Sequence, residues 1–168
     1  MPSDVPGAAV ANVEGWRSAF DGLLSPEFLT GISVEARASA LAARFSEPDY
    51  GMAVAETSDD GIIGFVDWGP GRDGHAPESR ELYAIYVRPS FQGKGVGRAL
   101  FGAAVESTLA AGHGKLVLCV LALNPHVRFY ERLGGSEMRR TLIELDGEER
   151  ELVYFEWSER GLRELAAP

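Results

Sequence analysis

Apolar residues recur at three- and four-residue steps in the first quarter of the chain, within residues 8–24 and again within residues 33–45. This spacing gathers the apolar side chains on one face of a helix. Ser33 is a residue type that often caps a helix N-terminus, and Glu47-Pro48 ends the second pattern. We therefore predict two amphipathic helices, separated by a break at Leu24-Ser25-Pro26.

The spacing shifts towards alternation from Gly51 onward, which is typical of β-strands. Two turn compositions, Ser58–Gly61 and Asp146-Gly147, predict tight hairpins between flanking strands. Residues 114–121 form a nearly unbroken apolar run, as expected of a central strand buried on both faces. The predicted strands span residues 52–55, 62–66, 81–87, 114–121, 137–145 and 149–157.

Two further helices are predicted between the strands. One spans residues 96–111 after a glycine-rich turn, and the other begins at the cap Asn124-Pro125 and ends at Gly134-Gly135. Residues 69–78 are rich in glycine and proline without apolar periodicity, which predicts a mobile surface loop. This order of elements favours one α/β domain over residues 1–168, with a mixed sheet covered by helices.

Composition narrows the class of protein. The chain has 168 residues with 45% hydrophobic content, which is enough for one sizeable core. No apolar run approaches the roughly 20 residues that a membrane-spanning helix needs, and residues 1–7 lack the pattern of a signal peptide. We therefore expect a soluble, cytoplasmic protein that contacts no membrane.

The net charge and the numbers of cysteine and histidine residues limit which partners and cofactors are expected. The net charge of −9 comes without a basic patch, so nucleic acid is not an expected partner. Cys119 is the only cysteine and the three histidines lie far apart, so neither a disulfide framework nor a metal site is expected. The acidity would suit a cationic amine substrate, although acidic surfaces more often serve solubility.

A glycine-rich segment is the most informative motif. The run Gln92-Gly93-Lys94-Gly95-Val96-Gly97-Arg98 follows a predicted strand and opens a predicted helix. Backbone N–H groups there can converge on a phosphate at the positive end of the helix dipole. A dinucleotide-binding fingerprint would need glycine where Arg98 stands, and a P-loop would need Gly-Lys followed by Ser or Thr. The segment therefore predicts a phosphate-bearing ligand of another kind.

This segment resembles the pyrophosphate-binding signature of the GNAT acetyltransferases, which reads Gln or Arg, two residues, Gly, one residue, then Gly or Ala. Here it is Gln92-Gly93-Lys94-Gly95-Val96-Gly97. Residues 82–89, Leu-Tyr-Ala-Ile-Tyr-Val-Arg-Pro, look like the family's fourth strand, and residues 124–134 look like its Asn…Phe-Tyr…Gly helix. The resemblance implies a single-domain α/β GNAT fold, with a mixed, mostly antiparallel twisted sheet and helices on both faces. It also implies acetyl-CoA as the co-substrate.

Two positions depart from the family pattern. Members usually begin with a strand before the first helix, and only residues 1–7 are available for it, so this strand is expected to be missing or rudimentary. Members also commonly carry an aromatic residue where Gly135 stands. The packing near the acyl end of acetyl-CoA is therefore expected to differ.

The resemblance further implies which residues hold acetyl-CoA. Backbone groups of Ile85, Tyr86 and Val87 would pair with the pantetheine arm, and an N–H near Val87 would face the thioester oxygen. The main-chain N–H groups of residues 92–98 would hold the pyrophosphate, with Lys94 and Arg98 as charge partners.

Tyr130 is the candidate catalytic residue that the resemblance implies. It falls where the family's helix presents a tyrosine hydroxyl to the sulfur, which suits it to protonate the leaving thiolate. Its helical spacing from Val127 and Leu133 is also typical of a core aromatic residue. Asn124 would hydrogen-bond the acetyl-CoA arm by the same resemblance, although its capping role also accounts for it.

Glu81 is the candidate general base for the amine proton. It lies six residues before Val87 on the same predicted strand and hence on the same face, where some members of the family carry a glutamate base. A solvated or edge-protecting charge is the alternative interpretation. Tyr83 shares that face and could line the acceptor site, with Asp67 and Trp68 as further lining candidates.

The implied reaction is direct attack of a small molecule's primary amine on the acetyl thioester in a ternary complex. The alternatives are a protein or peptide N-terminus as acceptor, a longer acyl group, and a non-catalytic CoA-binding sensor. The last predicted hairpin also offers a sheet edge, at which Phe155 and Trp157 could pair two copies into a homodimer.

Overall fold

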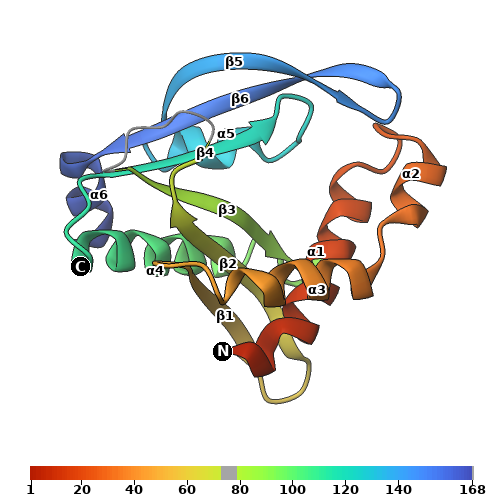
Figure 1. The fold of residues 1–168 in the computed structure, drawn as a ribbon, viewed down its shortest axis with the longest axis horizontal. Helices are drawn as coiled ribbons and strands as arrows, with labels where there is room; N and C mark the ends of the chain where they lie inside the picture. The colour runs from red at the N-terminus through yellow and green to blue at the C-terminus, as the bar shows by residue number, and fades with distance from the viewer. Residues whose placement is uncertain (73–78, 168) are drawn as a thin grey trace.

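The computed structural model describes residues 1–72 and 79–167, so most of the predicted loop over residues 69–78 lies outside the described residues. The helices are α1 (Val5–Ala19), α2 (Pro26–Gly31), α3 (Val34–Arg44), α4 (Val96–Ala110), α5 (Val127–Arg132) and α6 (Glu159–Ala166). The strands are β1 (Gly51–Thr57), β2 (Gly61–Pro70), β3 (Ser79–Val87), β4 (Lys115–Leu121), β5 (Ser136–Leu145) and β6 (Glu148–Ser158). Figure 1 shows their arrangement.

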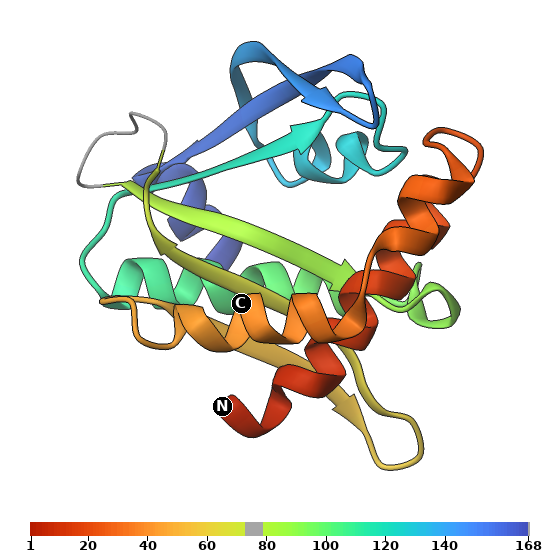
Figure 2. The ribbon, with the colours of Figure 1, turned by 45° about the vertical axis from the view of Figure 1, so that its right-hand side comes forward.

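The strands of the described residues form one open sheet in the order β1-β2-β3-β4-β6-β5. Neighbouring strands are antiparallel except β3 and β4, which run parallel. Helices α1 and α3 cover one face of the first three strands, and α4 covers the other (Figure 2). This mixed, mostly antiparallel sheet with helices on both faces confirms the predicted fold class. The described chain opens with a 3-10 turn that leads into α1, and no strand precedes α1 within residues 1–72.

Helix α1 packs closely on the sheet because its inward face is built from small residues. Ala8 and Ala11 are fully buried and pack with Phe65 of β2. Gly15 continues this face, and a Cβ atom there would lie only 2.6 Å from the ring of Tyr86 on β3. The absence of a side chain at Gly15 therefore allows α1 to lie directly on the strand that carries part of the site.

The segment at Ser25-Pro26, which the sequence predicts as a break, begins helix α2. The Ser25 hydroxyl accepts a hydrogen bond from the N–H of Phe28 at 3.1 Å, and Pro26 occupies the first helical position. Both features favour a helix start, because proline has no N–H to lose at that position. The chain thus turns from α1 into α2 and reaches the turn of the last hairpin, where Ser25 contacts Asp146.

Helix α5 begins at Val127, later than the Asn124-Pro125 cap predicts. The Asn124 side-chain oxygen accepts from the N–H of His126 at 2.8 Å, and its carbonyl oxygen accepts from the N–H of Val127 at 3.1 Å. Asn124 therefore closes a turn ahead of the helix and does not cap the helix itself. This leaves its side-chain NH₂ group available.

The predicted homodimer contact of Phe155 and Trp157 is wrong for these residues. The exposed fractions of Phe155 and Trp157 are 2% and 1%, and both belong to the buried core cluster that includes Phe101 of α4. At this end of the sheet the edge strand is β5, because β6 lies between β4 and β5. The hairpin turn itself is confirmed, since Asp146 and Gly147 have the positive φ angles, 57° and 72°, that a tight hairpin turn requires.

Gly135 lies against the ring of Trp157. This contact gives a physical reason why position 135 departs from the family pattern. A Cβ atom at Gly135 would lie 2.6 Å from the Trp157 ring and 3.0 Å from the carbonyl oxygen of Tyr130. The Trp157 indole is fixed there by donating to the carbonyl oxygen of Leu133 at 2.7 Å. The indole therefore fills the space that an aromatic side chain at position 135 would need.

We expect Gly135→Ala to lower the free energy of unfolding by about 1–3 kcal/mol, because an added methyl group overpacks a filled core. Urea unfolding measures this change. Gly102→Ala in α4 is the matched control: a Cβ atom there meets nothing within 4 Å, so the variant should be neutral or slightly more stable. A Gly135→Ala variant as stable as the wild type would contradict the close packing described above.

Candidate active site

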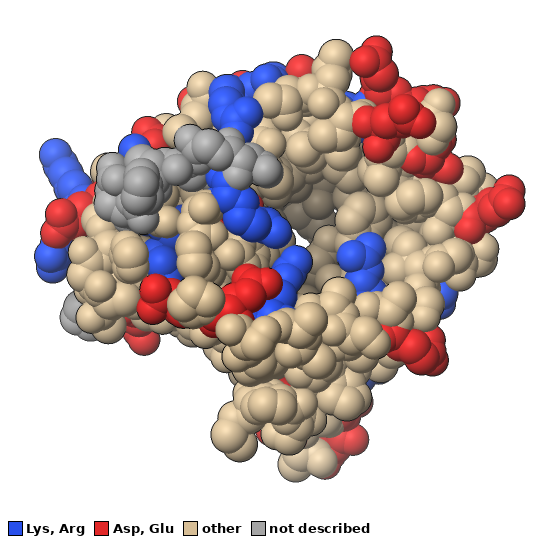
Figure 3. All heavy atoms as spheres, in the orientation of Figure 1, with Lys and Arg blue, Asp and Glu red and all other residues tan. Residues whose placement is uncertain are grey.

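Strands β3 and β4 separate along most of their length. They pair only from Ser79 to Glu81 on β3 and from Lys115 to Val117 on β4. Beyond that point the two strands diverge, and a cavity of about 330 Å³ lies between them. We call it the strand cavity. The molecular surface is hollowed in this region, and Lys or Arg side chains stand around the hollow (Figure 3).

The strand cavity is lined from several distant parts of the sequence. Residues 82–86 of β3 and 118–121 of β4 form its two walls, and α5 contributes Tyr130. Two aromatic residues at the end of α1 and three apolar residues of the last hairpin close it: Trp16, Phe20, Ile143, Leu145 and Leu152. The sequence does not mark these five as site residues, because their apolar pattern indicates only that they face inward.

Tyr130 is the best-placed acid–base group of the cavity. Its ring is held between those of Phe129 and Phe155, with centroid distances of 5.3 and 6.1 Å. Its hydroxyl has no hydrogen-bond partner among the residues that the structure describes. Burial, with a smaller contribution from Cys119, raises the pKa of Tyr130 above its usual value. The hydroxyl therefore stays protonated at neutral pH.

The register of β3 decides which backbone groups face the strand cavity. The N–H of Arg88, just after β3, donates to the carbonyl oxygen of Ile63 in β2 at 2.8 Å. Because antiparallel pairs alternate, Tyr86 also points its N–H and C=O towards β2, opposite Phe65. Ile85 and Val87 then point theirs towards β4, where no strand pairs with them. Of the three predicted backbone contacts, Ile85 thus opens to the cavity, Val87 directs its N–H to the same side while its carbonyl oxygen accepts from Gln92, and Tyr86 instead pairs within the sheet.

The glycine loop continues from the end of β3. Gly93 and Gly95 have φ angles of 73° and 84°, and Gly95 precedes the first residue of α4. The N–H groups of residues 93–95 donate to no carbonyl oxygen in the described part of the chain. The Gln92 side chain ties the loop to β3 by donating to the carbonyl oxygen of Val87 at 3.0 Å.

This loop fits a phosphate group. Positive φ angles direct successive N–H groups to one side, the first turn of α4 adds its own unpaired N–H groups, and the helix dipole favours negative charge. Added side chains at Gly93 and Gly95 would meet nothing within 4 Å, so the space in front of the loop is open. Lys94 and Arg98 are exposed beside it, with the Lys94 ammonium 5.2 Å from the Phe91 ring.

Asn124 lines the strand cavity where β4 ends. Its side-chain oxygen is engaged by His126, and its NH₂ group donates to no described residue. An amide donor at the wall of the cavity fits the hydrogen-bonding role that the resemblance implies for it.

Glu81 does not share a face with Val87, contrary to the prediction from their spacing. A bulge in the β2–β3 ladder places one extra residue, Tyr83, between Leu82 and Ala84, so the alternation of faces is shifted below it. The Glu81 carboxylate is buried and accepts from the guanidinium of Arg72 at 2.7 and 3.2 Å. It also accepts from the N–H of Arg72 at 2.8 Å.

The other predicted lining residues separate into two groups. Tyr83 lines the strand cavity, with the guanidinium of Arg72 over its ring at 3.9 Å. Trp68 is buried in the core on the opposite face, next to α4, and does not reach the cavity. Asp67 is fully buried, does not line the strand cavity and forms an ion pair with Arg44.

Asp67, which is fully buried, forms an ion pair with the partly buried Arg44 beside Tyr83. Arg44 Nη1 lies 2.6 Å from Asp67 Oδ2, and the Tyr50 hydroxyl donates to the same oxygen at 3.1 Å. The Arg44 guanidinium in turn lies 4.9 Å from the ring of Tyr83. Burial raises the pKa of Asp67, and the charge of Arg44 opposes this shift.

No group of three or more His, Cys, Asp or Glu side chains in the described part of the chain could hold a metal ion. None of the helices within residues 1–72 and 79–167 is long and apolar enough to cross a membrane.

Comparisons with known proteins identify the family to which this fold belongs. The family model for the acetyltransferase (GNAT) family matches residues 17–135. The uncharacterized N-acetyltransferase YuaI of Bacillus subtilis is 26% identical over 144 residues, which cover 86% of this chain and 82% of YuaI. Among solved structures, a ribosomal-protein-alanine N-acetyltransferase from Brucella melitensis superimposes with a TM-score of 0.72 at 20% identity, covering 94% of this chain and 96% of that one.

A second solved structure, the PaiA N-acetyltransferase of Thermoplasma acidophilum in complex with coenzyme A, has a TM-score of 0.67 at 19% identity and 94% coverage of both chains. These two structures support the fold. The family model spans more than half of the chain and includes both the glycine loop and Tyr130. The chain therefore belongs to the GNAT family of acetyltransferases, whose acyl donor is acetyl-CoA.

Proposed function

We propose that the protein transfers the acetyl group of acetyl-CoA to a primary amine of a small molecule, by direct attack within a ternary complex. The observation that carries the proposal is the position of Tyr130, whose uncommitted hydroxyl belongs to a side chain that lines the strand cavity. The open backbone edge of β3 and the glycine loop lead from this cavity to the start of α4. This path suits a long ligand with a phosphate group at one end.

Binding and orientation come from named donors of this chain. The N–H groups of residues 93–98 would hold the pyrophosphate, and the backbone of Ile85 and the Asn124 amide would hold the arm. The N–H of Val87 would then point to the thioester oxygen and stabilise the negative charge that develops there. Because these donors are fixed by the sheet and by α4, they need little rearrangement.

Tyr130 supplies the proton in this scheme. The amine forms its C–N bond as the C–S bond breaks, and the Tyr130 hydroxyl donates its proton to the departing sulfur. A proton released from the amine to water then restores the hydroxyl. Both oxygens of Glu81 accept from Arg72, so a role for Glu81 as the base requires this ion pair to open.

Acetyl-CoA binding by calorimetry, combined with release of free thiol in the presence of a mixed panel of amines, tests the proposal. Binding with amine-dependent thiol release supports the transferase. Binding without release to any amine favours the non-catalytic sensor. An absence of acetyl-CoA binding overturns the proposal altogether.

The glycine loop allows a separate prediction. Arg98→Glu should raise the Kd for acetyl-CoA by about 10-fold or more, because it replaces a cation with an anion beside the proposed phosphate site. Calorimetry at low and high salt measures this, and the effect should shrink with salt. The control is Arg163→Glu on α6, which is far in the sequence from the loop. An unchanged Kd would show that Arg98 does not act on the phosphates.

A further inference from the structure

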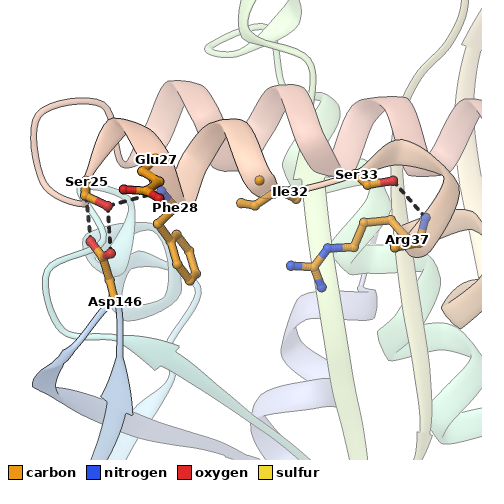
Figure 4. A pocket seen from close by; sticks show the side chains of 9 residues that line it. Ser25, Glu27, Phe28, Ile32, Ser33, Arg37 and Asp146 are labelled. Carbon is orange, nitrogen blue, oxygen red and sulfur yellow. Dashed lines mark hydrogen bonds between the residues drawn. The ribbon is translucent and has the colours of Figure 1, made fainter.

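A second cavity adjoins the strand cavity. It has a volume of about 530 Å³ and lies between α2, α3 and the turn that joins β5 to β6 (Figure 4). We call it the outer cavity. Trp16 lies between the two and lines the strand cavity. Its ring centroid is 6.3 Å from that of Phe28 and 5.7 Å from the guanidinium carbon of Arg37, and both of these residues line the outer cavity. An acceptor whose amine lies at Tyr130 would have to extend past Trp16 to reach the outer cavity.

Arg37 is the cationic side chain that lines the outer cavity. Its guanidinium extends from α3 into the cavity (Figure 4), and the side chain is half-buried. Among the described residues no oxygen accepts a hydrogen bond from the Arg37 guanidinium and no carboxylate pairs with it; its contact is with the Trp16 ring. A guanidinium has five N–H donors in a planar fork that matches a carboxylate, so an uncommitted one at a cavity wall is a strong candidate for ligand binding.

The neighbouring arginines show the contrast. Arg17 gives its donors to the carbonyl oxygens at the end of α2, at 3.2 Å to Leu29 and 3.1 Å to Ile32, and this is a structural role. Arg44 and Arg72 are held by buried carboxylates, as described above. Of these four arginines, Arg37 is thus the one whose guanidinium makes neither a hydrogen bond nor an ion pair with the described residues.

The acidic groups of the outer cavity form no ion pair with Arg37. Asp146 instead accepts with its two oxygens from the N–H and hydroxyl of Ser25, at 2.6 and 2.7 Å. Glu27 is exposed in the first turn of α2 and makes no ion pair with Arg37. The N-terminal end of α3, capped by Ser33, also faces the cavity, and its dipole adds positive potential.

We infer that Arg37 binds a carboxylate on the acceptor, so the acceptor is a small amine that also carries a carboxylate, with an apolar part that packs against Trp16 and Phe28. This inference rests on the proposed function and specifies its substrate class. It differs from what the net charge of −9 suggests, because the overall acidity would favour purely cationic amines. The group within hydrogen-bonding reach, here a guanidinium that no described carboxylate pairs with, and not the charge of the whole chain, decides what binds at that point of the wall.

The test compares pairs of acceptors that differ only in the carboxylate, such as apolar amino acids and the amines formed by their decarboxylation, for example phenylalanine and phenylethylamine. The wild type should give a higher kcat/KM for the carboxylated member. Arg37→Met should lower kcat/KM for carboxylated acceptors by about 10- to 100-fold and leave their decarboxylated partners unchanged. Arg37→Lys, which keeps the charge but loses the fork, should fall in between.

The controls separate this inference from the proposed function. Arg163→Met, which removes an exposed ion pair with Glu159 on α6, should change neither class of acceptor, and each variant should keep its Kd for acetyl-CoA. Acetyl transfer only to decarboxylated amines, or an equal effect of Arg37→Met on both classes, would overturn the inference while leaving the transferase intact. A failure of the wild type to bind acetyl-CoA would instead remove the proposed function and this inference with it.

Discussion

The Tyr130→Phe variant should lose about 10²- to 10⁴-fold in kcat while it binds acetyl-CoA as tightly as the wild type. The reason is that phenylalanine keeps the ring contacts to Phe129 and Phe155 but removes the proton that the departing sulfur needs. Thiol release under saturating acetyl-CoA and amine measures kcat, and calorimetry measures binding.

Tyr154→Phe is the control for Tyr130→Phe, because it removes a tyrosine hydroxyl from β6 at a position that does not line the strand cavity. It should keep kcat within a few-fold of the wild type. The loss in Tyr130→Phe should also grow when the thiol leaving group is made more basic, since a poorer leaving group depends more on protonation. If Tyr130→Phe retained full kcat, water or another group would have to protonate the sulfur.

The Arg44→Met variant should be less stable than the wild type by about 3 kcal/mol at neutral pH, because it leaves the charge of Asp67 uncompensated. Asp67 is fully buried, and Arg44 is its ion-pair partner. Urea unfolding measures the change. Arg163→Met on the surface of α6 is the matched control, and its effect should stay below about 1 kcal/mol because both side chains of that pair are exposed.

The pH dependence of Arg44→Met distinguishes charge from packing. Burial raises the folded-state pKa of Asp67, and loss of Arg44 should raise it further. A carboxyl group whose pKa is higher in the folded state contributes stability at low pH, and this contribution is lost as the pH rises through the folded-state pKa. The destabilisation should therefore be smaller at about pH 5 than at about pH 7. In the Arg44→Met/Asp67→Asn double variant, this change with pH should disappear; the same penalty at both pH values would point to lost packing instead.

Local patterns in the sequence predict much of this fold. The turn at Asp146-Gly147 and the buried run of β4 depend on a few adjacent residues, and both appear in the structure as predicted. The start of α2 could also be found locally, because Ser25 followed by Pro26 is a helix-start signal and not only a break. Such features need no knowledge of distant contacts.

The candidate site depends more on distant contacts, and there the predictions are less complete. The bulge at Tyr83 arises from how β2 and β3 pair, and it changes the face of Glu81 without any mark in the local sequence. Arg37 likewise reads as an ordinary charged position on an amphipathic helix. Its importance follows from what the other arginines bind, which only the packed structure shows.

The short β3–β4 pairing has a mechanical consequence. Three residue pairs join strands β1–β3 to strands β4–β6 within the sheet, so the two halves share few backbone hydrogen bonds. So short a ladder adds little resistance to relative motion of the halves, which their shared core mainly opposes, and such motion would change the width of the strand cavity. A ligand that forms hydrogen bonds along the open edge of β3 while contacting β4 would bridge the two halves as an added strand does, for as long as it stays bound. Its binding free energy would then contribute directly to the rigidity of the whole sheet.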